Sequence, residues 1–243
     1  LRYGRESARL PSHLLQFSKD KKPVVVWNMT RRCNLKCIHC YAGSQDRLYP
    51  DELTTEEAKT MIADLAGFGA PVLLFSGGEP LMRADLPELA RFAVERGMRA
   101  VISTNGTLIS ERQARVFREI GLSYVGVSLD GTEATHDRFR GVAGAFASAM
   151  RGIRICRDLG IKVGVRFTIN RHNAADVPAI FDLLEAESIP RCCFYHLVYS
   201  GRGSKLIGED LSHDGTRKLL DLIMDRTRDL FDRGLQKAIL TVD

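Results

Sequence analysis

Residues 71–97 read PVLLFSGGEPLMRADLPELARFAVERG and contain one complete unit of the pattern that the rest of the chain repeats. The run 71–75 is continuously apolar, as in a strand that is covered on both faces. Residues 76–80 are typical of a turn, and 86–95 follow as a helix that Gly97 ends. A strand, a polar turn and a helix therefore follow one another in this stretch.

The same order of elements recurs on both sides of it. Upstream, the apolar run 24–27 is typical of a strand buried on both faces, and residues 54–57 form a capping box that opens a helix. Downstream, we predict strands at 99–103, 124–129, 162–169 and 191–197, each followed by a helix. The connections are short, except for a long loop that leads from Asp130 to a helix at 143–159.

Six strand-then-helix units with short connections predict a parallel sheet with right-handed crossovers. We therefore expect an α/β fold, a partial TIM-like barrel of six βα units. It would form a single domain at 23–243, after a short N-terminal arm at 1–22. Residues that follow the strands form the active site in such barrels. A flat, doubly wound sheet would also bind ligands there, so this placement alone does not decide between the two.

Composition limits the class of protein. Of the 243 residues, 44% are hydrophobic and 27% are charged, as in a globular protein with a substantial core. The net charge of +5 is mild and the basic residues are scattered, which favours an anionic ligand over nucleic acid. No stretch approaches the roughly 20 apolar residues of a membrane span. With no signal-peptide pattern either, we expect a cytoplasmic protein, in which clustered cysteines bind metal more often than they form disulfides.

Three cysteines, Cys33, Cys37 and Cys40, lie close together directly after the first predicted strand. A [4Fe–4S] cluster takes four ligands, so three cysteines would leave one iron open to a ligand that is not protein. Zinc is the main alternative, but its structural sites usually have two pairs of ligands. His39 is an alternative fourth ligand, although its place between two of the cysteines is cramped.

The Cys-x3-Cys-x2-Cys spacing is similar to the cluster motif of the radical S-adenosylmethionine (radical SAM) superfamily. The resemblance implies that S-adenosylmethionine chelates the open iron through its amino and carboxylate groups. An electron from the cluster then cleaves the sulfonium, which gives methionine and a 5′-deoxyadenosyl radical. The resemblance covers essentially the whole chain, and we expect a reductant such as flavodoxin or ferredoxin to supply the electron.

Later strand ends match further motifs of this family. The turn after the second strand resembles its GGEP segment, where backbone carbonyls and the glutamate receive the ammonium group of the cofactor. After the third strand, Ser103 and Asn105 could hydrogen-bond the ribose hydroxyls, although an Asn-Gly turn alone would explain Asn105. The residues of the GGEP segment are Gly77, Gly78, Glu79 and Pro80.

Ser128 and Asp130 end the fourth strand, and Arg140 follows in the long loop. In the peptide-maturing branch of the family, a serine and an arginine at this separation contact the ribose and the carboxylate. Arginine suits a carboxylate because it donates two parallel hydrogen bonds, and a solvated loop arginine is the alternative. We therefore expect Arg140→Ala to weaken cofactor binding without loss of the cluster. Adenine contacts are expected near His39 and Tyr41, mostly from backbone atoms.

The stretches 23–41 and 194–203 resemble the enzymes that tailor tetrapyrrole propionates (the SPASM-related NirJ and AhbD group), which act in making haem or haem d. The resemblance implies hydrogen abstraction from a propionate, followed by loss of carbon dioxide or of the side chain. A substrate with many carboxylates would need cations, although surface charge is an equally good explanation of each candidate. The candidate substrate residues are Arg166, His196, Tyr199 and Arg202.

Relatives in this branch usually carry a C-terminal cysteine-rich extension, and we expect this chain to lack it because it ends at Asp243. Two other functions stay open. A peptide-maturing radical SAM enzyme of the SPASM type would share the core, but the residues before Val24 are too few for a leader-binding module. A non-enzymatic iron–sulfur scaffold or electron carrier would need four protein ligands and would have no use for the GGEP turn.

Overall fold

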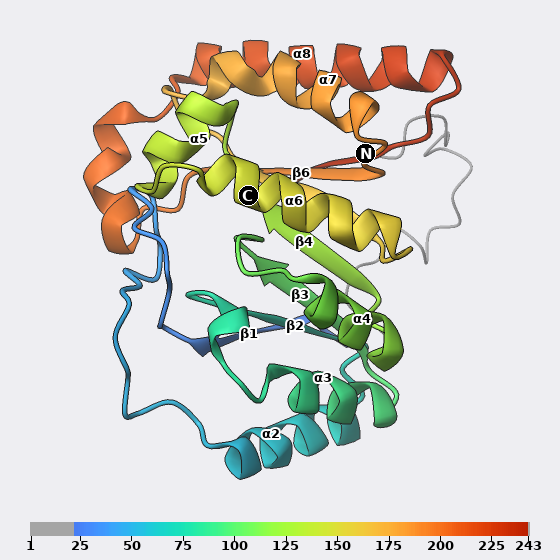
Figure 1. Cartoon of the computed structure of the whole chain (residues 1–243). Helices are drawn as coiled ribbons and strands as arrows, with labels where there is room; N and C mark the ends of the chain where they lie inside the picture. Colours follow the sequence, from blue (N-terminus) through green and yellow to red (C-terminus); the bar gives the residue numbers. More distant parts are fainter. Residues whose placement is uncertain (1–21, 243) are drawn as a thin grey trace.

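The computed structural model describes residues 22–242, in which strands and helices follow the predicted order (Figure 1). Seven strands form one parallel sheet, and each strand pairs with the next one along the chain. Within the described residues the first and last strands do not pair, so the sheet is an open, partial barrel. The strands are β1 (Val25–Thr30), β2 (Val72–Gly77), β3 (Arg99–Thr104), β4 (Tyr124–Ser128), β5 (Val163–Thr168), β6 (Arg191–Tyr195) and β7 (Ala238–Val242).

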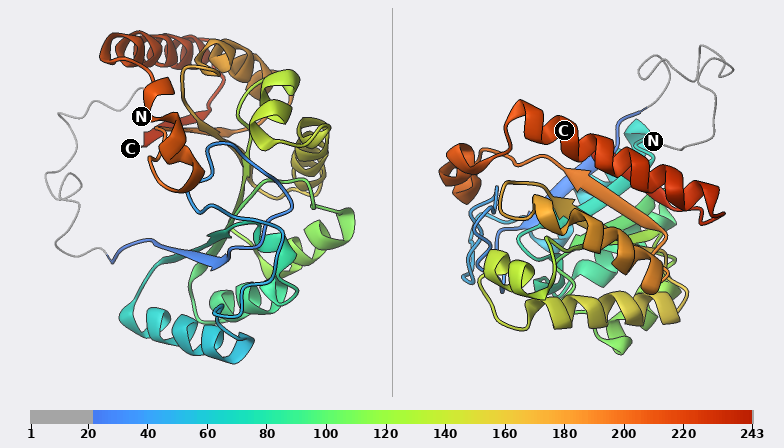
Figure 2. Two further views of the ribbon diagram at one scale, coloured as in Figure 1. Left: turned by 90° about the vertical axis from the view of Figure 1, so that its left-hand side faces the viewer. Right: turned by 90° about the horizontal axis from the view of Figure 1, so that it is seen from above.

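Helices cover the outer, convex face of this sheet (Figure 2). The core lies between the two layers, where alternate strand residues such as Leu73, Phe75 and Ile102 are fully buried. The helices are α2 (Thr55–Phe68), α3 (Leu86–Glu95), α4 (Glu111–Ile120), α5 (Glu133–Arg140), α6 (Ala145–Asp158), α7 (Val177–Ala186) and α8 (His213–Asp232), with short 3₁₀ helices η2 (Pro80–Met82), η3 (Ala174–Asp176) and η4 (Gly201–Glu209).

The six-unit partial barrel is confirmed, and β7 adds a seventh strand after α8. The predicted capping box is also present, because Thr54 accepts from the amide of Glu57 and the Glu57 carboxylate accepts from the amide of Thr54. The predicted arm at 1–22 lies, except for Lys22, outside the described residues, so the predicted domain boundary stays a prediction. None of the described helices is long and apolar enough to cross a membrane.

The prediction that the first strand is buried on both faces is wrong. Val24 and Val26 are 58% and 55% exposed, whereas Trp27 on the other face packs against Phe75. The reason is the open barrel: β1 is an edge strand, and the face that carries Val24 and Val26 lines the open interior of the barrel. The continuous apolar run therefore marks an edge of the barrel interior rather than a central strand.

The prediction of a long loop after Asp130 is also wrong, because α5 occupies most of it. Only His136, Phe139 and Arg140 of this short helix are buried. Phe139 and Arg140 follow His136 by three and four residues, so all three lie on one face of the helix. Two of these three buried residues are polar, so the sequence lacks the apolar stripe that identifies a helix. Tertiary contacts, rather than hydrophobic periodicity, decide this element.

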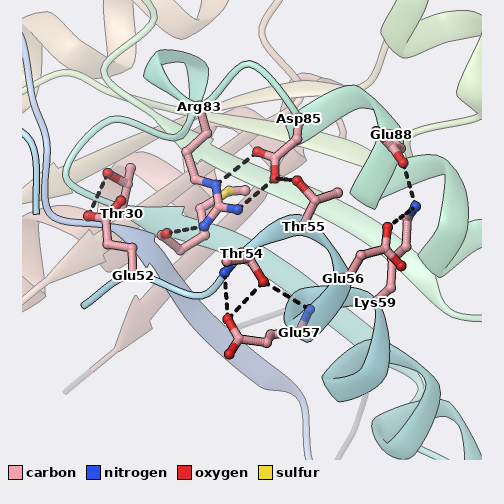
Figure 3. Close-up of polar contacts among 11 residues, drawn as sticks. Thr30, Glu52, Thr54, Thr55, Glu56, Glu57, Lys59, Arg83, Asp85 and Glu88 are labelled. Carbon is pink, nitrogen blue, oxygen red and sulfur yellow. Dashed lines mark hydrogen bonds and ion pairs between the residues drawn. The ribbon is translucent and has the colours of Figure 1, made fainter. Parts of the chain in front are cut away.

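All strands end on the same side of the molecule, as they must in a parallel sheet. The cysteine loop (residues 31–50), α5 and η4 gather on that side, which faces the viewer in the left view of Figure 2. Polar contacts fix the place where the loop leaves β1 (Figure 3). Arg83 donates to the carbonyl of Met29 (2.9 Å) and pairs with Asp85 (2.6 Å), and the hydroxyl of Thr30 donates to Glu52 (2.9 Å).

Candidate functional site

The cysteine loop packs against the C-terminal end of α5. Two of its amides donate to the carbonyls of Phe139 (2.9 Å) and Arg140 (3.0 Å). Cys33 and Cys37 are buried in the loop, and Cys40 is half-buried. The structure therefore brings the three cysteines to the end of the sheet where the polar strand ends meet.

The sulfur atoms of two cysteines accept hydrogen bonds. Cys33 Sγ faces the amide of Leu35 (3.5 Å) and the amide nitrogen of the Asn105 side chain (4.0 Å). Cys37 Sγ accepts from Arg140 Nη1 (3.4 Å). Burial raises the pKa of the Cys33 thiol to about 12, and burial also raises the pKa of Cys37 against the opposing charge of Arg140.

The GGEP turn packs against the first residues of the cysteine loop. The amide of Gly78 donates to the carbonyl of Thr30 (2.6 Å), and the amide of Glu79 donates to the carbonyl of Arg32 (2.8 Å). A Cβ at Gly77 would collide with the Thr30 carbonyl oxygen, and one at Gly78 with that of Arg32. Gly77 also has a φ of 135°, which favours glycine. Both glycines are therefore required for this close backbone approach.

Glu79 is fully buried at the end of β2, where Pro80 begins η2. Its carboxylate accepts from the Thr104 hydroxyl (2.7 Å), the Asn105 amide (2.7 Å) and the Leu81 amide (3.1 Å). Burial raises the pKa of Glu79 to about 7, although these three hydrogen bonds lower it. The site thus holds a carboxylate whose charged form a neighbouring cation would stabilise.

The polar residues at the ends of β3 and β4 differ in their contacts. Asn105 is buried, and its side chain donates to Asn34 of the cysteine loop (2.8 Å) and accepts from the amide of Thr107 (2.9 Å). Ser103 and Ser128 are half-buried, and no hydrogen bond joins either hydroxyl to another of the residues 22–242. Asn105 therefore holds the cysteine loop, whereas the two serine hydroxyls are available.

A buried ion pair joins β4, α5 and the cysteine loop. Arg140 Nη2 lies 2.5 Å from Asp130 Oδ2, and His39 Nε2 of the loop lies 3.3 Å from the same oxygen. Burial alone would raise the pKa of Asp130, but the charges of Arg140 and then of His39 hold it below its usual range. The alternative of a solvated arginine is wrong, since Arg140 is 7% exposed and lies on α5.

Some polar atoms near this pair have no partner. Arg140 Nε and His39 Nδ1 are buried without a hydrogen bond among the described residues. Tyr41 differs, because its hydroxyl donates to Asn28 (2.9 Å) and its side chain is 40% exposed. Arg140 Nε is thus a buried donor without a partner among the described residues.

The sequence gives no signal for His136, which lies against the same ion pair. Its side chain is fully buried, and Nδ1 accepts from the amide of Asp130 (3.1 Å). Burial lowers the pKa of His136 to about 4, and the charge of Arg140 adds to this effect. His136 therefore stays neutral at neutral pH and fixes the backbone that carries Asp130.

We expect His136 to make the protein less stable in mild acid. In the unfolded chain its pKa is near 6.5, so stability falls as the pH drops from about 6.5 towards 4. His136→Asn retains an acceptor for the Asp130 amide but does not titrate. Between pH 7 and pH 5, the loss of unfolding free energy should be about 2 kcal/mol smaller in this variant. Urea denaturation measures it, and His213→Asn, which removes an exposed imidazole on α8, is the control.

Arg202 contacts the cysteine loop, although the sequence predicted it as a substrate residue. Its Nε donates to the carbonyl of Cys37 (2.6 Å), its Nη1 to the carbonyl of Ser44 (2.8 Å) and its amide to the carbonyl of Cys40 (2.8 Å). Gly201 allows this approach, because a Cβ there would lie 2.5 Å from the Cys40 carbonyl oxygen. The stretch around residue 202 therefore supports the cysteine loop.

The other predicted substrate residues are dispersed. Tyr199 is 52% exposed and its hydroxyl donates to Asp210. The amide of His196 donates to the carbonyl of Val242 (3.2 Å), beyond the end of β6. Arg166 lies within β5, over the ring of Tyr195. The structure thus does not bring the four predicted substrate residues together.

We expect Arg202→Gln to loosen the cysteine loop, because a glutamine cannot bridge two carbonyls that the guanidinium joins. The unfolding free energy should fall by about 2 kcal/mol, within the range for lost hydrogen bonds to a charged group. Reconstituted protein should also release iron to a chelator several times faster. Lys205→Gln, an exposed neighbour on η4, is the control. Unchanged iron release together with weaker substrate binding would instead support the substrate prediction.

The donor set fits an iron–sulfur cluster with one free iron. Nitrogen donors to cysteine sulfur are among the features that tune such clusters. Among the described residues, no three His, Cys, Asp or Glu side chains are arranged to ligate a single metal ion. Each cysteine of a cubane cluster binds a different iron, so the cysteine Sγ atoms need not converge on one point. Beside the cysteines lie a buried carboxylate at Glu79 and an unpartnered donor on Arg140, which suit an ammonium and a carboxylate.

Known proteins have sequences and folds similar to those of this chain. The model of the radical SAM superfamily matches residues 27–184. Fe-coproporphyrin III synthase of Methanosarcina barkeri is 66% identical over 243 residues, which are 100% of this chain and 61% of that protein. Pre-heme d1 synthase of Dinoroseobacter shibae is 48% identical over 221 residues, 90% of this chain and 55% of that protein.

The fold also matches a solved structure. Streptococcus suis SuiB bound to S-adenosylmethionine superimposes with a TM-score of 0.77 at 16% identity, over 90% of this chain and 50% of that one. The chain thus spans between half and about three fifths of the length of these three proteins. The matched segment runs from β1 to α7 and includes the cysteine loop, the GGEP turn and the Asp130–Arg140 pair. The chain belongs to the radical SAM superfamily, whose members bind a [4Fe–4S] cluster and S-adenosylmethionine.

Proposed function

We propose that this protein is a radical SAM enzyme that modifies propionate side chains of a tetrapyrrole in haem biosynthesis. The observation that carries the proposal is the 66% identity to Fe-coproporphyrin III synthase, which extends over the whole chain. It includes β6, η4 and β7, which lie outside the match to the superfamily. A second relative, pre-heme d1 synthase, is also named for a tetrapyrrole.

Cys33, Cys37 and Cys40 would hold the [4Fe–4S] cluster and leave one iron for S-adenosylmethionine. When bound, cluster and cofactor supply a one-electron cleavage that gives methionine and a 5′-deoxyadenosyl radical, which abstracts hydrogen from the substrate. A reductant of the flavodoxin or ferredoxin type would supply the electron. The task of the chain itself is to hold these groups and orient them.

The GGEP turn would bind the ammonium group of the cofactor. Glu79 is buried with a raised pKa, and an adjacent ammonium would favour its ionised form. The carbonyls of Gly77 and Gly78 would add neutral acceptors, and Pro80 fixes the backbone as η2 begins. A buried carboxylate without a partner cation is costly, so this site gains most from a cationic ligand.

Arg140 would offer its free Nε to the cofactor carboxylate, while its other nitrogens stay with Asp130 and Cys37. The free hydroxyls of Ser103 and Ser128 would bind the ribose, and backbone atoms near His39 and Tyr41 would contact the adenine. Asp130 and Asn105 would be positioning residues. Asp130 would hold Arg140 in place, and Asn105 would hold the cysteine loop in place. These side chains thus bind and orient, and none needs to transfer a proton.

Anaerobic turnover tests this proposal. The cluster-loaded protein is reduced and incubated with S-adenosylmethionine and a siroheme-derived tetrapyrrole. We expect 5′-deoxyadenosine to form together with a tetrapyrrole of lower mass. The side-chain radical left by hydrogen abstraction would give a vinyl group by losing carbon dioxide and passing one electron to an external one-electron acceptor. If the whole side chain left instead as an unsaturated acid, the remaining ring radical would take up one electron from the reductant and one proton. Mass spectrometry separates the two reactions, since loss of carbon dioxide and loss of a whole side chain change the mass differently. Formation of 5′-deoxyadenosine from the cofactor without any change in the tetrapyrrole would contradict the proposed substrate.

A further inference from the structure

The open barrel encloses a cavity of about 860 Å³ that the proposed cofactor contacts do not use. Its wall comes from β2 to β7, and the exposed Val24, directly before β1, lies at its edge. Binding sites for small molecules and cofactors typically measure about 300–1,000 Å³. The cavity is therefore large enough for a substantial ligand, and its polar residues indicate which kind.

The cavity is lined by cations without counter-charges. Among the described residues, no Asp or Glu lines it. One cation, Lys237, donates to two carbonyls at the end of α7, at 2.7 and 3.0 Å. The other four form no ion pair within residues 22–242, whereas Arg154 on the outer surface pairs with Glu187. These four unpaired cations are Arg99, Lys162, Arg166 and Arg191.

Two of these cations are held in place by tyrosines. The guanidinium carbon of Arg166 lies 4.6 Å from the ring centroid of Tyr195, and that of Arg191 lies 5.0 Å from the ring of Tyr124. Such contacts orient a guanidinium and leave its N–H groups free to bind an anion. Burial raises the pKa of Tyr124 to about 12 despite the two arginines, so its hydroxyl stays protonated.

Two neighbouring glycines make room for this arrangement. Gly126 of β4 and Gly164 of β5 lie opposite each other in the sheet. A Cβ at Gly126 would lie 2.8 Å from Cδ of Arg166, and one at Gly164 would collide with the Tyr124 hydroxyl. Arg166 and Tyr124 can thus lie flat across the inner face of the sheet. Arg166 and Arg191 are thus half-buried in the wall of the barrel, whereas Arg99 and Lys162 are exposed at its rim.

The cavity runs from the starts of the strands towards the proposed cofactor site. Arg191 and Tyr195 begin and end β6, and four residues of a strand rise about 13 Å. At the end of the cavity nearer the cofactor site, Arg166 lies beside Ser128 in the sheet. Ser128 precedes Asp130 by two residues. A molecule along the cavity would therefore present one end to the cofactor site and the other to the cations at the strand starts.

We propose that this cavity is the substrate subsite, in which Arg166, Arg191, Arg99 and Lys162 bind the substrate carboxylates that do not react. This inference rests on the proposed function, since it takes the ligand to be a polycarboxylate tetrapyrrole. A guanidinium binds a carboxylate through two parallel hydrogen bonds, and the tyrosine rings offer apolar surface to a planar macrocycle. The reacting side chain would then point towards Ser128, at the end of β4.

Equilibrium dialysis of iron-coproporphyrin III against the anaerobic, cluster-loaded full chain tests the subsite without turnover. This probe carries four propionates, and its tetraethyl ester has the same macrocycle without their charges. We expect Arg166→Gln and Arg191→Gln each to weaken binding of the acid about 10-fold, and the double variant about 100-fold. Arg112→Gln, an exposed arginine on α4, should bind as the wild type does. Affinity for S-adenosylmethionine should be unchanged in all four.

The outcomes separate this inference from the proposed function. If the wild type binds the acid and both cavity variants bind it equally well, the subsite is wrong and the proposed function stands. If the wild type binds neither the acid nor the ester, the tetrapyrrole itself is the wrong ligand and both proposals fall. Equal affinity for the acid and the ester would also overturn the subsite, because charge would then contribute nothing.

Discussion

Cys37→Ala is expected to lose essentially all of its iron and to show no cleavage of S-adenosylmethionine. The variant retains only two of the three thiols proposed to hold the cluster, and no other cysteine lies in the loop. The Arg140 N–H that Cys37 Sγ accepts would also lose its partner in the buried site. Iron content after anaerobic reconstitution and 5′-deoxyadenosine after reduction measure the two effects.

Cys156→Ala is the matched control for this variant. Cys156 is buried in α6, away from the loop, and the substitution likewise removes one thiol. It should cost stability through packing but leave the iron content unchanged. Full iron content and continued cofactor cleavage in Cys37→Ala would refute the assignment of the cluster ligands.

Asp130→Asn is expected to lower the free energy of unfolding by about 3–5 kcal/mol, because removal of one partner leaves the other charge buried and unpaired. Arg140 is 7% exposed, and Asp130 is its only carboxylate partner among the described residues. The sequence alone predicts that Arg140→Ala spares the cluster. Since Arg140 also contacts Cys37, we now expect this variant to lose stability and iron together.

Removing both charges tests the origin of this effect. The double variant Asp130→Asn, Arg140→Met leaves no unpaired charge and should recover more than half of the stability lost by Asp130→Asn. Urea denaturation of the cluster-free protein gives the three free energies. Arg115→Gln breaks an exposed pair with Glu111 and should cost less than about 0.5 kcal/mol. If Asp130→Asn also costs no more than this, the buried pair does not stabilise the fold.

The sequence predicts the strand-helix series well because each unit carries its own local signals. Apolar runs define the strands, and the predicted capping box at Thr54 begins α2. A second capping box, at Ser110, begins α4. The cysteine spacing and the GGEP turn identify the family for a similar reason, since their residues lie next to one another in the chain. Local patterns of this kind can be recognised without knowledge of the fold.

The misinterpreted features depend on contacts between distant segments. Val24 and Val26 are apolar in any context, and only the open edge of the sheet leaves them exposed. The environment of Arg140 is decided by Asp130 and Cys37, and Cys37 lies 103 residues away in sequence. The contacts of Arg202 with the cysteine loop also join distant segments, and its predicted role in substrate binding stays a prediction. A single sequence does not reveal contacts between distant residues, because each of these side chains could equally lie on the surface.

The contact between Arg202 and the cysteine loop also has a consequence for the order of folding and cluster insertion during synthesis. Arg202 and Cys37 are 165 residues apart in sequence, whereas each strand pairs only with the next one. The sheet can therefore form strand by strand as the ribosome delivers the chain, but the cysteine loop gains its contacts with Arg202 only after a much later segment has been made. Closing so long a segment is slow compared with local pairing. We therefore expect cluster insertion to follow synthesis of η4, so that the reactive iron is admitted only once the barrel around it is nearly complete.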